Sequence, residues 1–145
     1  MISMGEGIMS RLSRYLVVAG LLWSGAICSK AFAQSTIWSP TAVPTAADGG
    51  DATPVELGVK FRADTDGTVT GIRYYKSAAN TGTHIGNLWS STGTLLATAT
   101  FSGETSSGWQ QVNFSSPVAI TAGTTYVASY YAPAGHYAVD QSFFS

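Results

Sequence analysis

Cysteine is almost absent from this chain of 145 residues, which contains only Cys28. We expect Cys28 to lie in a segment that is removed on export, so the remaining chain can form neither a disulfide nor a thiolate metal site. Charge is scarce as well, because Asp, Glu, Lys and Arg together make up 10% of the residues. The stability of the folded part must therefore come from apolar packing and strand pairing.

Basic side chains are few beyond residue 33. Four cations, Lys60, Arg62, Arg73 and Lys76, stand against seven carboxylates there, which gives a net charge of about −3. Binding to nucleic acid or to an anionic membrane surface needs a cationic patch. The charge balance therefore argues against both partners.

Motifs that carry catalysis are missing too. The sequence has no Gly-x-Ser-x-Gly, His-Glu-x-x-His, Walker or Gly-x-Gly-x-x-Gly pattern. Glu56 falls on the polar side of an expected strand and Glu104 in a Ser/Gly-rich loop, so we expect both carboxylates to be solvated. The sequence predicts a non-enzyme without a cofactor.

What the sequence does contain begins with an export signal. Arg11 and Arg14 precede an apolar run over residues 15–23, and small residues follow up to Ala33. This order is typical of a secretory signal peptide, and the run is shorter than the roughly 20 residues that span a bilayer. We predict a signal peptide over residues 1–33, cleaved between Ala33 and Gln34. The product is expected to be secreted, periplasmic or at the cell surface, with no membrane attachment.

The remaining chain has the pattern of strands. Residues 34–53 form an expected extended leader, and residues 54–145 form an expected domain. Apolar residues alternate with polar ones over 55–64, which is the period of a half-buried strand. Further strands are expected over residues 68–76, 85–90, 94–101, 109–114, 118–120, 125–132 and 137–140. No segment after residue 33 has helical periodicity, so the predicted fold is all-β: an antiparallel, jelly-roll-like β-sandwich preceded by a signal peptide.

Two local features refine this prediction. The sequence Asp64-Thr65-Asp66-Gly67 has the residues of a hairpin turn, which would pair the strands on either side of it. Val69 and Ile72 cannot share a face in a regular strand, so Gly71 is expected to mark a bulge or a bend that changes the register. Asp64-x-Asp66-Gly67 also resembles the beginning of a calcium-binding loop. It lacks the later acidic ligands, however, which favours the turn, and we predict no metal site.

An ordered set of motifs resembles a known family. The motifs cover residues 55–64, 67–76 and 81–89, followed by 108–112, 117–126 and 135–138. Over residues 38–144 the chain resembles a secreted bacterial family known as domain of unknown function 4082. The resemblance implies an accessory role, since family members lie in large exported proteins beside immunoglobulin-like or glycosidase-like modules. It also implies a closing strand of the Asn-Tyr-Trp-Val-Asp type, which this chain lacks, so we expect the sandwich to be without its last strands.

Aromatic side chains are the main candidates for ligand binding. Tyr75, Trp89 and Tyr131 can offer ring faces on which a sugar stacks, and the alternative for each is core packing. Trp109 and Tyr126 are expected in the core. His84 and His136 fall in expected loops and could line a shared pocket with Asp140, although structural hydrogen bonds are an alternative role.

These residues lead to one main functional hypothesis and two alternatives. The main hypothesis is an exported, non-catalytic accessory module that binds carbohydrate or cell-envelope glycan. The alternatives are a structural spacer or adhesion module of a larger extracellular protein, and a small extracellular hydrolase.

Overall fold

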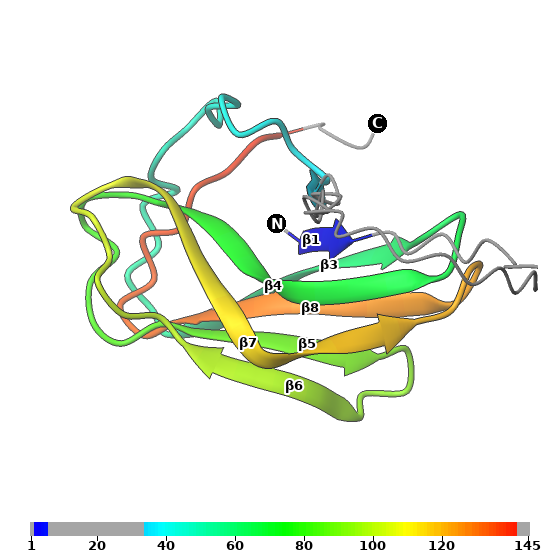
Figure 1. Ribbon diagram of the computed structural model, residues 1–145. Coiled ribbons are helices and arrows are strands. Elements are labelled where there is room, and N and C mark those ends of the chain that lie inside the picture. Colours follow the sequence, from blue (N-terminus) through cyan, green and yellow to red (C-terminus); the bar gives the residue numbers. More distant parts are fainter. Residues whose placement is uncertain (1, 6–33, 142–145) are drawn as a thin grey trace, which may run out of the picture.

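The computed structural model describes residues 2–5 and 34–141, which form two antiparallel sheets packed face to face (Figure 1). Apart from residues 2–5, the predicted signal peptide and its cleavage site after Ala33 lie outside the described residues. The described part contains no helix, and hence none that could cross a membrane. Its strands are β1 (Ile2–Gly5), β2 (Gln34–Thr36), β3 (Val55–Arg62), β4 (Gly67–Lys76), β5 (Ile85–Ser90), β6 (Leu95–Thr100), β7 (Gly108–Ile120) and β8 (Thr125–Ala132).

The strand order confirms an all-β sandwich. One sheet has the order β2-β1-β4-β7 and the other β3-β8-β5-β6. From β3 onward, consecutive strands change sheet at every connection except the β5–β6 hairpin, which is the pattern of a jelly roll. The hairpin predicted around Asp64–Gly67 is therefore wrong: β3 pairs with β8, and β4 pairs with β1 and β7. The turn residues are there, but they connect the two sheets.

The core lies between the sheets and is built from their inward-facing residues. Val69, Ile72 and Leu88 are almost completely buried. The other buried apolar residues are Phe61, Ala63, Tyr74, Phe101, Phe114, Ile120, Tyr126, Ala128 and Ala132. Tyr74 connects the two layers, because its ring on β4 stacks at 4.1 Å on that of Tyr130 on β8.

Gly71 marks a bulge in β4, as predicted. The register between β4 and β7 shifts between Val69 and Gly71, which lets Val69 and Ile72 both face the core. A Cβ atom at position 71 would lie 2.1 Å from the carbonyl oxygen of Val112. Only glycine fits at this close approach of two backbones.

Two expected segments differ from the observed strands. The strands predicted over 109–114 and 118–120 are one strand, β7, because its pairing with β4 resumes beyond the bulge. The strand predicted over 137–140 is reduced to two isolated bridges, Ala46–Val139 and Lys76–Tyr137. The first bridge and β2 place parts of the leader, residues 34–53, against the sandwich.

Candidate functional site

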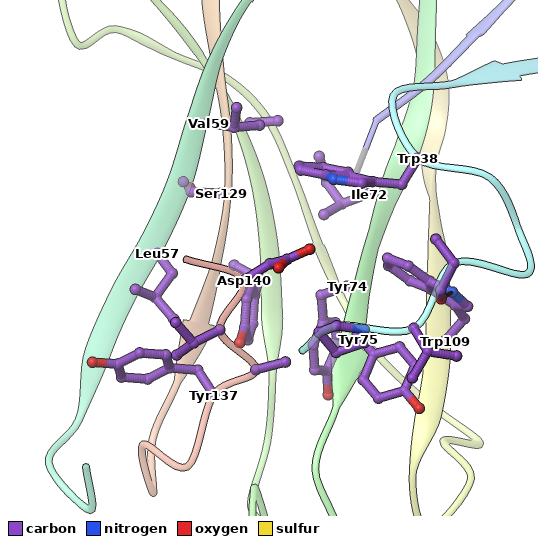
Figure 2. Close-up of a pocket in the computed structure, with 18 residues that line it drawn as sticks. Trp38, Leu57, Val59, Ile72, Tyr74, Tyr75, Trp109, Ser129, Tyr137 and Asp140 are labelled. Atoms are coloured by element: carbon purple, nitrogen blue, oxygen red, sulfur yellow. Dashed lines mark hydrogen bonds between the residues drawn. The ribbon is translucent and has the colours of Figure 1, made fainter. Parts of the chain in front are cut away.

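A cleft of about 390 Å³ opens between β3 of one sheet and β4 of the other. Figure 2 shows Leu57 and Val59 on one side, Ile72 and Tyr74 on the other, and Asp140 between them. The segments around Trp38 and Tyr137 complete the wall. Most of the inner lining is aliphatic or aromatic, so the cleft resembles an unfilled part of the sandwich core.

Two of the predicted site residues, Tyr75 and Asp140, line this cleft. The carboxylate of Asp140 accepts a hydrogen bond from the hydroxyl of Thr45. Tyr75 packs edge-on against Trp109, with ring centroids 5.3 Å apart. Trp109 was expected in the core but is only half-buried. Its indole N–H donates to the carbonyl of Ala42 at 2.8 Å, which fastens the leader segment to β7.

Trp89 and Tyr131 lie away from the cleft, on the outer face of the sheet β3-β8-β5-β6. Residues directly opposite each other in paired strands share a face. Val127 on β8 lies opposite Trp89, and Tyr131 on β8 lies opposite Glu56. Val127 and Tyr131 are an even number of positions apart, so all four side chains are on the same face of the sheet. Tyr131 lies four residues along β8 from Val127, which is roughly 13 Å at the usual rise per residue.

A chain of hydrogen bonds occupies the surface between these two aromatic positions. The indole N–H of Trp89 donates to Ser129 Oγ at 2.8 Å. Ser129 Oγ in turn donates to Glu56 Oε1, which also accepts from Asn87 Nδ2 at 2.9 Å. Ser129 and Asn87 are only 5% and 9% exposed, although their register places them on an outer face. We name this set, Trp89, Ser129, Glu56, Asn87 and Tyr131, the outer-face strip.

Glu104 is not solvated, contrary to the expectation from its loop. Its side chain is 13% exposed and accepts hydrogen bonds from Lys76 Nζ at 2.7 Å and from the hydroxyl of Tyr74 at 2.8 Å. His84 Nδ1 lies 3.0 Å from both carboxylate oxygens. Burial alone would raise the pKa of Glu104. The bonds from Lys76 and Tyr74 outweigh it, so the pKa is lowered and the carboxylate stays ionised.

His84 is fully buried beside this carboxylate. Burial lowers its pKa more than Glu104 raises it, so the ring is neutral near pH 7. A neutral ring that donates from Nδ1 to Glu104 must accept at Nε2, which lies 2.8 Å from the side-chain amide of Asn80. Rotating that amide turns Nδ2 toward His84. Asn80 Nδ2, which lacks a hydrogen-bond partner in the other orientation, then donates to His84, and Oδ1 gives up this contact.

His136 has a different carboxylate partner from His84. Its Nδ1 is 3.0 Å from a carboxylate oxygen of Asp48, and its backbone has a positive φ of 51°. A hydrogen bond from the backbone N–H of Gly50 is the main cause of the lowered pKa of Asp48, to which His136 adds. Neither histidine lines the cleft that holds Asp140. The structure therefore does not bring the three residues into the shared pocket considered from the sequence.

The acidic turn at Asp64 and Asp66 has a structural contact of its own. Asp66 Oδ1 accepts a hydrogen bond from the backbone N–H of Ala122 at 2.8 Å, which ties this connection to the β7–β8 turn. Within residues 34–141, no group of three or more His, Cys, Asp or Glu side chains is placed to hold a metal ion.

Sequence reasoning missed Asn87, Ser129 and Glu56 as parts of one site. They lie on three different strands, and only the pairing of β8 with both β3 and β5 brings them together. Trp38 lines the cleft. As the one large apolar side chain of a polar leader, it was the signal that this segment packs against something.

The geometry defines the class of protein: a jelly-roll-like β-sandwich with an aromatic and polar strip on the outer face of one sheet and an apolar cleft between the sheets. The particular family follows from comparison with known families. A family model described as domain of unknown function (DUF4082) matches residues 41–145, and the chain belongs to that family. No curated protein and no solved structure matches the chain significantly.

Proposed function

We propose that this chain is a non-catalytic glycan-binding module of an exported protein, and that the outer-face strip is its binding surface. The observation that carries the proposal is the hydrogen-bonded chain from Trp89 through Ser129 to Glu56. It fixes an aromatic ring and a carboxylate side by side on an open sheet.

The position of Trp89 suits a sugar ring. Its N–H donates to Ser129 on the neighbouring strand, so the indole is directed across β8 rather than away from the sheet. A hexose has an apolar face of C–H groups, which can pack on such a ring, and a polar edge of hydroxyl groups. Because the indole is already fixed, binding loses little side-chain entropy.

Glu56 supplies the polar partner. Oε1 accepts from both Asn87 and Ser129, which holds the carboxylate in place, while its side chain is on the exposed side of β3. A hydroxyl group of a sugar can donate to the second oxygen, and a hydrogen bond to an ionised acceptor is stronger than one to a neutral acceptor. Lys60 lies further along the same face of β3, which makes the surface mixed in charge and suits a neutral glycan.

Catalysis has less support than binding. The buried carboxylate–imidazole pair, Glu104 and His84, lies where His84 is 1% exposed. A substrate cannot reach that imidazole without unfolding the end of the sandwich. The pair is better explained as a structural support for Tyr74.

Binding of a glycan panel by isothermal titration calorimetry tests the proposal. Hexasaccharides of β-1,4-glucose, β-1,3-glucose and β-1,4-N-acetylglucosamine serve as probes. Trp89→Ala should weaken binding about tenfold, as expected for the loss of one aromatic stacking partner. Tyr75→Ala removes a ring from the other sheet and should leave the affinity unchanged.

Each contrary result has its own meaning. Loss of binding in Tyr75→Ala but not in Trp89→Ala would move the site to the cleft. Absence of binding to every glycan would refute the proposal and favour the spacer or adhesion module. Circular dichroism of both variants checks that the sheets are intact.

A further inference from the structure

The strand β6 forms an open edge of the sheet β3-β8-β5-β6, because among the described residues it pairs with β5 alone. Figure 1 shows β6 at the rim of the sandwich. An open strand edge presents backbone N–H and C=O groups that can pair with a strand of another chain. Natural sheets guard such edges with charged side chains, with proline or by keeping the edge strand very short.

The other three edges of the two described sheets have such guards. β2 has only three residues, and β7 contains Pro117, which has no N–H to offer. β3 exposes the charged side chains of Glu56, Lys60 and Arg62. Residues 91–103, which contain β6, have no charged side chain and no proline. Within the described sheets, β6 is therefore the unguarded edge.

The outer face of β6 is apolar at one end. Leu95 and Leu96 are 47% and 39% exposed, and they are two of the three large apolar residues that the described part of the chain leaves exposed. A bulge places both on the outer face, because Leu95 lies opposite Trp89, and Leu96 precedes Ala97, which packs against the core. Pairing with another strand would remove part of this apolar surface from water.

The hydrogen bonds to β5 determine which residues of β6 can pair outward. Next to the ends of the two strands, the N–H of Phe101 donates to the carbonyl of His84. In an antiparallel pair, hydrogen-bonded residues alternate with residues whose N–H and C=O groups point away from the partner strand. Thr98 and Thr100 therefore direct these groups to the open edge, and the side chains of both are exposed.

We propose that two copies of this chain pair antiparallel through β6, with Thr98 of each copy on the twofold axis, which joins their β3-β8-β5-β6 sheets into one. In this register, Leu96 of one copy lies opposite Thr100 of the other. A second copy fits the edge because the paired segments carry no charges that would repel each other. Since the same edge serves both copies and the other edges are guarded, assembly closes at the dimer.

The dimer has a consequence for ligand binding. Strand pairing continues the plane of the sheet, so the outer-face strips of both copies lie on the same side of the joined sheet. Two linked sites bind a polymeric ligand with higher avidity than either site alone. This consequence rests on the proposed glycan binding, whereas the dimer itself can be measured without any glycan.

Sedimentation equilibrium of the chain of 145 residues, with Cys28→Ser removing its only thiol, tests the proposal. One strand edge is small for a stable interface, so we expect a Kd of about 10 to 100 µM for the dimer. Thr98→Lys places two ammonium groups at the axis and should raise the Kd about tenfold or more. Thr124→Lys, the matched control, adds the same charge at an exposed position between β7 and β8 and should leave the Kd unchanged. A monomer at about 1 mM, or an assembly that Thr98→Lys does not weaken relative to Thr124→Lys, would overturn the proposal.

A disulfide test covers the case in which Thr98→Lys does not fold. In the Cys28→Ser background, Thr98→Cys places one thiol of each copy at the axis, where opposite Cα atoms are about 5.5 Å apart and within the range of a disulfide. Oxidation should therefore link Thr98→Cys into a dimer faster than it links Thr124→Cys. Equal rates would show that random collision forms the bond, and no linked dimer of Thr98→Cys would show that β6 does not pair at this position. Either result overturns the proposal.

Discussion

Glu104 forms a buried polar cluster with Tyr74, Lys76 and His84. Substitution of Glu104 tests this cluster most directly. In Glu104→Gln, the amide oxygen can still accept from Tyr74 and His84, but the new NH₂ group faces the ammonium of Lys76, whose side chain is 11% exposed. Removing one partner of a buried ion pair costs about 3 to 5 kcal/mol. Lys76 retains some contact with water, so we expect a loss of about 3 kcal/mol in the free energy of unfolding.

Urea denaturation of the wild type, Glu104→Gln, Lys76→Met and the double variant measures this loss. Small domains respond to urea by about 1 to 3 kcal/mol per M, so the midpoint should fall by about 1 to 3 M in Glu104→Gln. The double variant should recover much of the stability, because it leaves no uncompensated charge. A loss below about 0.5 kcal/mol in Glu104→Gln, or additive losses in the double variant, would refute the view that Glu104 and Lys76 act as a buried pair.

Three further predictions concern pH, backbone packing and processing. Because the pKa of neutral His84 is lowered, its contribution to stability is complete above the ordinary histidine value of 6.5 and is lost as the pH falls below it. Glu104, whose pKa is also lowered, adds a further loss of stability at more acidic pH. In thermal melting, the midpoint temperature of unfolding should therefore fall from about pH 6.5 downward. Gly71→Ala should destabilise the fold by about 2 kcal/mol or more, because its Cβ would meet the Val112 carbonyl. Gly93→Ala, in an open turn, should cost less. Calorimetry compares the stability of the two variants. N-terminal sequencing of the exported protein should read from Gln34, and a start at Met1 would show that no signal peptide is cleaved.

Local patterns were enough to predict where most strands lie. Alternation over residues 55–64 predicted β3, and the strands predicted over residues 85–90 and 125–132 have the bounds observed for β5 and β8. The bulge at Gly71 could be predicted because Val69 and Ile72 are both apolar and lie three positions apart, which in a regular strand would place them on opposite faces. These features depend on side chains close together in the sequence.

Pairing between distant strands could not be predicted in the same way. The Asp64–Gly67 turn has hairpin residues, yet it joins two sheets, because β3 finds its partner in β8, more than 60 residues away. Glu104 shows the same limit for a side chain. Its Ser/Gly-rich surroundings indicate solvent, while Tyr74, Lys76 and His84, which bury it, lie 20 to 30 residues earlier.

The outer-face strip and the β4 edge belong to different sheets, so glycan binding and the removal of β1 can be separated physically. The strip depends on β3, β8 and β5, whose register is set within residues 55–132. The edge depends on β4 and on whichever strand pairs with it. Removing β1 should change neither the bond from Trp89 to Ser129 nor the position of Glu56. Glycan affinity should therefore be the same before and after removal of residues 1–33, as long as each protein is folded.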